Sequence, residues 1–141
     1  MDKEFVPYEE SLALKELGFD EPCNTCYDKL EMVASYGASV FDYKNYNTTG
    51  YMVSRPTFSQ SFKWFREKYK LHYSIDYESS QHDHKWGYNY TIYNYNQVVK
   101  TNEEYIQSNP IAPAGEWVYE THEEAELACL KKLIEIANEQ Q

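Results

Sequence analysis

The most regular pattern in the chain is a run of aromatic residues at helical spacing. Its members follow one another at intervals of four, three and four residues: Phe58, Phe62, Phe65 and Tyr69. Such intervals place side chains on one side of an α-helix. Thr57 and Gln60 form a capping box, in which each side chain satisfies a backbone N–H at the helix start. The pattern predicts a helix whose aromatic side lies in the core, with Trp64 beside it as a partly exposed anchor.

Two further helices are predicted near the ends of the chain. The first begins near Pro7, whose fixed φ suits a first turn, and ends at Gly18, which can adopt a left-handed cap. Its apolar side carries Tyr8, Leu12, Ala13 and Leu17. The other helix begins at a second capping box, formed by Thr121 and Glu124. Its apolar side carries Leu127, Leu130, Leu133, Ile134 and Ala137.

Alternation of apolar and polar residues predicts a β-hairpin between the second and last helices. Residues 71–77 alternate strictly, and a second strand is predicted over residues 86–95. One face of that second strand carries Trp86, Tyr88, Tyr90 and Ile92, and the other carries Asn89, Thr91, Tyr93 and Tyr95. Short apolar groups within residues 21–54 indicate two or three short strands, and residues 117–119 indicate another after a long loop at 101–116.

These elements define the fold class. The predicted order is α-β-β-α-β-β-β-α, with no internal repeat and no second domain in residues 1–141. An antiparallel sheet with helices packed on one face is the simplest arrangement that buries all of the apolar stripes. We therefore predict a single α+β domain.

Composition and charge narrow the classes of function. Tyr accounts for 15 of the 141 residues, and the formal net charge is -10. The charge argues against direct binding of nucleic acid or of an anionic membrane surface, because both depend on Lys and Arg. No run approaches the roughly 20 apolar residues that span a bilayer, and residues 1–10 lack the pattern of a secretion signal. We therefore expect a cytosolic protein.

The tyrosine-rich hairpin is the main indication of function. A strand can bury only one of its faces against helices, yet aromatic residues occur on both faces of residues 86–95. Tyr combined with Asn, Ser and Thr is typical of recognition surfaces. The expected partner-binding residues are Tyr88, Tyr90, Tyr93, Tyr95 and Trp64. Alternatively, the surplus rings pack against the long loop or against a second copy of the chain, which leaves a homo-oligomer open.

The cysteines do not predict a cofactor or a metal. Cys23 and Cys26 have the spacing of a redox pair or of half a zinc site. No clear helix follows them to activate a redox thiol. The remaining zinc ligands would be His82 and His84, whose spacing departs from the usual pattern. We expect no metal and no cofactor.

The residue types of a hydrolytic triad occur on one face of the first hairpin strand, as His72, Ser74 and Asp76. Neighbours on one strand face lie roughly 6.6 Å apart at Cα, which does not suit a triad. No glycine-rich turn or oxyanion hole accompanies them. We therefore predict a polar strand face and a protein that is not an enzyme.

The second predicted helix has a basic side that suggests an alternative function. It consists of Lys63, Arg66 and Lys70, with Arg55 and Lys68 nearby. These residues can hold an anion or a nucleotide phosphate, with a neighbouring Tyr stacked on the base. They can equally form an ordinary mixed-charge surface, because Glu67 lies within helical pairing distance of Lys63 and Lys70.

Three blocks of the chain resemble a family of short uncharacterised proteins of tailed bacteriophages and prophages. They are EFVPYEESLALKELGFDEPC, PTFSQSFKWFREKY and THEEAELACLKKLIEIA, at residues 4–23, 56–69 and 121–137. The tyrosine-rich hairpin lies outside them. The resemblance implies a viral protein with a small accessory role in the host cytoplasm, during takeover of the host or against its defences. It assigns no functional residues to this chain.

Three functional hypotheses follow. The first is non-enzymatic binding of a host or phage protein through the tyrosine-rich sheet and the acidic surface. The second is sequestration of a nucleotide or another anion at Lys63, Arg66 and Lys70. The third is mimicry of nucleic acid by rows of carboxylates, which would inhibit a host factor that binds nucleic acid.

Overall fold

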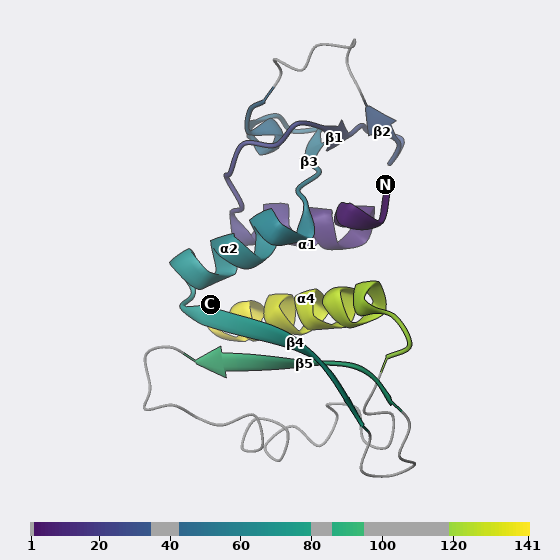
Figure 1. Cartoon of the computed structure of the whole chain (residues 1–141). Coiled ribbons are helices and arrows are strands. Elements are labelled where there is room, and N and C mark those ends of the chain that lie inside the picture. The colour runs from purple at the N-terminus through teal and green to yellow at the C-terminus, as the bar shows by residue number, and fades with distance from the viewer. Residues whose placement is uncertain (1, 35–42, 80–85, 95–118) are drawn as a thin grey trace. The chain divides into compact units, whose positions relative to one another are not determined.

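Helices and two antiparallel sheets make up the regular structure (Figure 1). The computed structural model describes residues 2–34, 43–79, 86–94 and 119–141. The chain divides into two compact units, Met1–Trp64 with Ile134–Gln141, and Phe65–Leu133. Each unit is described below by itself.

The first unit begins with a short 3-10 helix η1 (Asp2–Glu4) and then α1 (Tyr8–Leu17). The predicted glycine cap of α1 is confirmed, because Gly18 has a φ of 97°. Its backbone N–H donates to the carbonyl of Lys15 at 3.0 Å. Such a left-handed residue satisfies carbonyls at a helix end that would otherwise lack a partner. Phe19 then returns the chain to the core, where it is buried.

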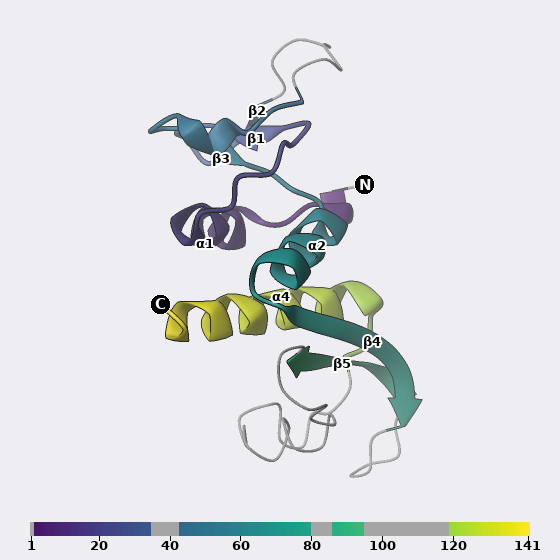
Figure 2. The same ribbon diagram turned by 90° about the vertical axis from the view of Figure 1, so that its left-hand side faces the viewer.

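A small three-stranded sheet follows α1 in this unit, and Figure 2 shows it from a second side. Its strands are β1 (Cys26–Tyr27), β2 (Val33–Ala34) and β3 (Val53–Ser54), in the order β2-β1-β3, with the 3-10 helix η2 (Tyr46–Thr48) before β3. The sequence indicated two or three short strands within residues 21–54, and the described part of that range contains three. Lys15 ties α1 to the segment before β3, because its Nζ donates to the carbonyls of Thr49 at 2.9 Å and Met52 at 2.7 Å.

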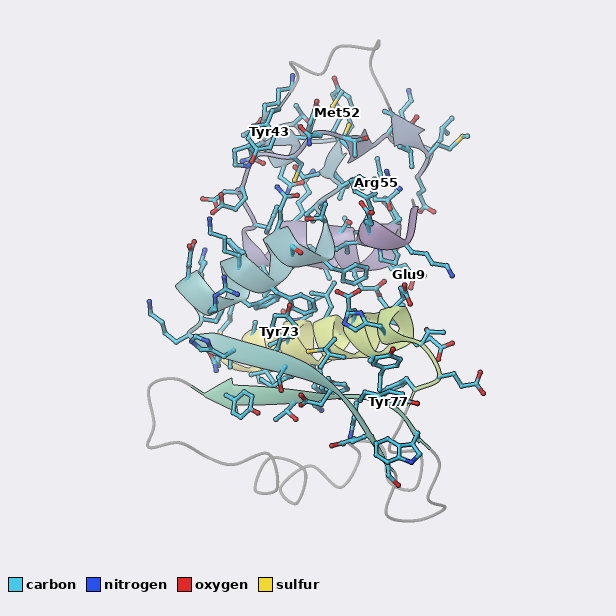
Figure 3. The ribbon with its side chains drawn as sticks, in the orientation of Figure 1. Glu9, Tyr43, Met52, Arg55, Tyr73 and Tyr77 are labelled. Carbon is cyan, nitrogen blue, oxygen red and sulfur yellow. The ribbon has the colours of Figure 1, made fainter. Side chains whose placement is uncertain are left out.

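A buried group of aromatic and cationic side chains joins the N-terminal segment to this sheet. The hydroxyl of Tyr27 donates to the Val6 carbonyl at 2.7 Å and accepts from Arg55 Nε at 3.3 Å. The Arg55 guanidinium lies 4.1 Å from the centroid of the Phe5 ring, a cation–π contact. Arg55, labelled in Figure 3, is buried in the first unit. It is therefore not part of an exposed basic surface.

Helix α2 (Phe58–Lys68) has the predicted capping box. Thr57 Oγ1 accepts from the Gln60 N–H at 3.1 Å, and Gln60 Oε1 accepts from the Thr57 N–H at 2.9 Å. The aromatic stripe is buried at Phe58, Phe62 and Phe65 and half-buried at Tyr69. The expected exposure of Trp64 is wrong, since only 3% of it is accessible and its ring packs on Phe19 at 5.3 Å between centroids. A neighbour distant in sequence covers the side of the helix that the aromatic stripe leaves open.

The second unit contains the predicted hairpin. Strands β4 (Leu71–Ser79) and β5 (Trp86–Asn94) are antiparallel, with Leu71 opposite Asn94 and Ser79 opposite Trp86. Both ribbon views show α4 alongside this hairpin (Figures 1 and 2). α4 (His122–Glu139) begins with the predicted cap, in which Thr121 Oγ1 accepts from the Glu124 N–H at 3.1 Å. Residues 122–133 of this helix belong to the second unit.

The α+β class is confirmed by these helices and antiparallel sheets. The strands are divided between two sheets, whereas the sequence pattern indicated one, because alternation defines the faces of a strand but not its neighbour. An additional strand was expected at residues 117–119, of which the structure describes Tyr119. This residue pairs with Tyr88 through backbone hydrogen bonds of 2.8 and 2.6 Å. The loop expected at residues 101–116 lies outside the described residues.

Candidate functional site

Three aromatic rings form a contiguous group at the end of the hairpin next to residues 80–85. We call Tyr77, Trp86 and Tyr88 the hairpin-end cluster. The Tyr77 and Trp86 rings are stacked, with centroids 5.5 Å apart and planes at 29°, and the Tyr88 ring lies 5.1 Å from that of Tyr77. Tyr77 is 61% exposed and Trp86 is 63% exposed. Large rings that contact one another and are still mostly in water are unusual on a protein surface.

Strand register explains why these rings gather there. Tyr77 lies opposite Tyr88, and Ser79 lies opposite Trp86, so all four residues share one face of the hairpin. The same face carries Tyr73, and Tyr77 lies further along β4, toward the end of the strand at Ser79 (Figure 3).

Helix α4 lies near this face at Tyr73 and reaches it at Tyr88. Burial raises the pKa of the Tyr73 hydroxyl, and the negative charge of Glu126 on α4 adds to the effect. The His122 ring meets the edge of the Tyr88 ring at 5.6 Å and 83°. Because His122 is the first residue of α4, Tyr77 and Trp86 lie beyond the start of the helix and stay accessible.

The described segments that surround the hairpin-end cluster are acidic. Residues 71–79, 86–94 and 119–130 contain no Lys or Arg. Their carboxylates are Asp76, Glu78, Glu120, Glu123, Glu124 and Glu126. All of these except Glu126 are exposed. A surface of this charge attracts cationic groups.

The structure separates the tyrosines that the sequence grouped together. Tyr88 belongs to the hairpin-end cluster and is half-buried. Tyr93 is half-buried on the opposite face, where its Oη lies 3.4 Å from Ser74 Oγ. Tyr90 is only 8% exposed and stacks on Tyr119 with centroids 6.4 Å apart, so its expected accessibility is wrong. Tyr95 lies outside the described residues.

Exposure in the hairpin therefore depends on position along the strands rather than on the face. In the middle of β5 both faces are buried, since Asn89 and Thr91 are as inaccessible as Tyr90 and Ile92. Sequence reasoning placed Trp86 on the hairpin without assigning it to the site. The available signal was its position at the first residue of a predicted strand that follows the polar residues 80–85.

The basic residues on α2 and just after it are exposed, but Lys70 is engaged with the end of the helix. Lys63, Arg66 and Lys70 are exposed, and Lys70 has a φ of 59° just after the helix. Its Nζ donates to the Glu67 carbonyl at 3.0 Å, which is a cap of the helix C-terminus. Arg55 is buried elsewhere. Anion binding by Lys63, Arg66 and Lys70 stays a prediction.

The two closely spaced cysteines are fully buried in the small sheet. Burial raises the pKa of Cys23 to about 12, against the lowering effect of a hydrogen bond with Ser54. Burial also raises the pKa of Cys26. Thiols of this kind stay protonated near neutral pH, whereas metal ligation and redox exchange need the thiolate. His82 and His84 lie outside the described residues, within which no group of three metal-ligating side chains occurs.

The polar face of β4 forms hydrogen bonds of its own. The Ser74 hydroxyl donates to Asp76 Oδ2 at 3.1 Å, and the Asn89 amide donates to Glu78 Oε1 at 3.1 Å. In a hydrolytic triad a histidine takes the proton of the serine. Here the serine instead donates directly to the carboxylate, as on an ordinary polar strand face.

Glu126 carries a perturbed carboxyl group that offers a test of this packing. Burial raises its pKa above the ordinary value of 4.5. His122, whose Nδ1 lies 3.4 Å from Glu126 Oε1, lowers the pKa but offsets only part of this rise. The native state then binds the proton more tightly than the unfolded state. The stabilisation that Glu126 contributes is therefore fully present below pH 4.5. It declines as the pH rises through the pKa of Glu126 in the native state.

We expect Glu126→Gln to be more stable than the wild type at neutral pH, because glutamine has no charge to desolvate. Below about pH 4 the two proteins should differ little. Urea denaturation across a pH series measures the difference. A variant that is less stable at neutral pH would contradict the prediction, because the pairing with His122 would then outweigh burial.

In the part of the chain that the structure describes, no helix has the length and apolar character needed to cross a lipid bilayer. Comparison of the chain with protein-family models, with curated proteins and with solved structures finds no match.

Proposed function

We propose that the chain is a small accessory protein of phage type that acts by binding a host or viral protein, without catalysis. The hairpin-end cluster is its contact surface. It acts in the host cytoplasm, in takeover of the host or against its defences. The resemblance of residues 4–23, 56–69 and 121–137 to phage proteins supports this setting.

The exposure of the stacked rings of Tyr77 and Trp86 is the observation that carries the proposal. Tyr and Trp are enriched among the residues that dominate the energy of protein interfaces. Two rings that already support one another lose little conformational freedom when a partner covers them. The surface is therefore prepared for association before the partner arrives.

Partner capture tests the proposal. The full chain serves as bait in a lysate of the host, and captured proteins are compared between the wild type and the double variant Tyr77→Ala with Trp86→Ala. We expect affinity for the partner to fall about 30-fold or more, as for the loss of a dominant interface residue.

A matched control comes from the first unit of the chain. Tyr43 and Tyr51 are 54% and 59% exposed, close to the values for Tyr77 and Trp86. The double variant Tyr43→Ala with Tyr51→Ala should retain the partner, and circular dichroism should show that both double variants are folded. Retention of every captured protein by Tyr77→Ala with Trp86→Ala would refute the proposed contact surface.

A further inference from the structure

We infer that the partner segment received by the hairpin-end cluster is cationic and presents arginine side chains. This inference rests on the proposed function and adds the chemistry of the partner. It is carried by the joint presence of exposed ring faces and exposed carboxylates in one part of the second unit, where the described segments 71–79, 86–94 and 119–130 contain no Lys or Arg.

The rings supply a surface for a planar cation. Trp86 and Tyr77 are stacked at 29° and both are more than half exposed, so a ring face is open to a guanidinium group. Arg is the cation found most often over aromatic rings, and Trp is the ring that attracts it most strongly. A guanidinium is also more weakly hydrated than an ammonium group, which lowers the cost of placing it there.

Three glutamates follow, within two positions along the chain, residues that contact Tyr88. Glu120 directly follows Tyr119, whose backbone is hydrogen bonded to that of Tyr88. Glu123 and Glu124 directly follow His122, whose ring contacts Tyr88. These three glutamates are exposed and can each accept two hydrogen bonds from one guanidinium.

The charges distinguish arginine from other occupants. An apolar segment would take the carboxylates out of water without replacing their hydrogen bonds, which is unfavourable. A phosphate-bearing ligand would be repelled by the same groups. The positive end of the α4 dipole opposes a cation, but the first-turn acids Glu123 and Glu124 offset it. The formal net charge of -10 adds long-range attraction for a basic partner.

A peptide titration tests the inference without knowledge of the partner. The probe is an acetylated, amidated pentapeptide in which three arginines alternate with two glycines. The comparison peptides carry lysine or the neutral analogue citrulline in place of arginine. Binding is followed by amide NMR spectra of the full chain.

The arginine peptide should shift the indole N–H signal of Trp86 and the amide signal of Tyr88. It should bind more tightly than the lysine peptide, because a guanidinium lies over aromatic rings more often than an ammonium group does and is more weakly hydrated. The citrulline peptide should not bind. Equal binding of the arginine and citrulline peptides would overturn the inference.

Two charge variants with equal effects on net charge localise the site. Glu123→Gln with Glu124→Gln should weaken binding of the arginine peptide roughly three-fold. Glu9→Gln with Glu10→Gln changes the equivalent first-turn acids of α1 and should leave binding nearly unchanged. Equal weakening by both pairs would overturn the inference, because binding would then follow overall charge alone.

The outcomes separate the inference from the proposed function. If Tyr77→Ala with Trp86→Ala loses a captured partner while the arginine peptide binds no better than the citrulline peptide, the contact surface stands and its cationic specificity is refuted. If the arginine peptide binds at Trp86 but the double variant retains every captured protein, the proposed function is refuted and the cationic specificity of the surface stands.

Discussion

Phe62→Ala is expected to lower the free energy of unfolding by about 3–5 kcal/mol. Phe62 is almost fully inaccessible, and its ring stacks against that of Phe58 with centroids 6.2 Å apart. Removing the ring eliminates apolar contacts and leaves a cavity that the surrounding side chains fill only in part. Urea denaturation followed by circular dichroism measures the change.

Two further substitutions on α2 make this result interpretable. Ser59→Ala alters an exposed position of the same helix and should change the free energy of unfolding by less than about 0.5 kcal/mol. Phe62→Leu keeps most of the apolar volume and should lie between the wild type and Phe62→Ala, which keeps the test usable if Phe62→Ala does not fold. A loss of less than about 1 kcal/mol for Phe62→Ala would contradict a close-packed aromatic core around this residue.

The three cysteines of the native protein are expected to resist a thiol reagent such as Ellman's reagent near neutral pH. Cys23, Cys26 and Cys129 are free thiols with no accessible surface. With a pKa of about 12 in place of 9.0, Cys23 has a thiolate fraction about a thousand-fold below that of an ordinary thiol near neutral pH. Burial raises the pKa of Cys129 as well.

The reaction should become fast and complete for all three thiols when denaturant exposes them, which provides the internal control. Any slow reaction of the native protein should depend on local unfolding, because the reagent can reach the buried thiols only after the sheet or the helix around them opens. Rapid labelling of Cys23 or Cys26 in the native protein would contradict the prediction. It would restore the redox interpretation of their spacing.

The sequence predicted the helices well because their signals are local. A capping box at Thr57 and Gln60 and a glycine after Leu17 act within one helical turn, so residue types alone indicate where α2 begins and α1 ends. The strict alternation of residues 71–77 likewise predicted β4, since a strand turns successive side chains to opposite faces.

The candidate site could be predicted only in outline. The surplus of rings along the hairpin indicated that some would be accessible, and the hairpin-end cluster confirms an accessible group there. Which rings these are depends on where other segments end. Tyr90 is buried with Tyr119 stacked on it, whereas Tyr77 is 61% exposed, although both lie on the same face of the hairpin.

The chain by itself thus determined the helices, the hairpin, the α+β class and the acidic charge, all of which depend on residue type and on spacing along a few turns. Tertiary structure alone decided the burial of Trp64 against Phe19, the burial of Arg55 against Phe5 and the exposure of Tyr77 with Trp86. Each of these depends on whether residues far apart in sequence contact one another. Spacing along one element carries no information about such neighbours.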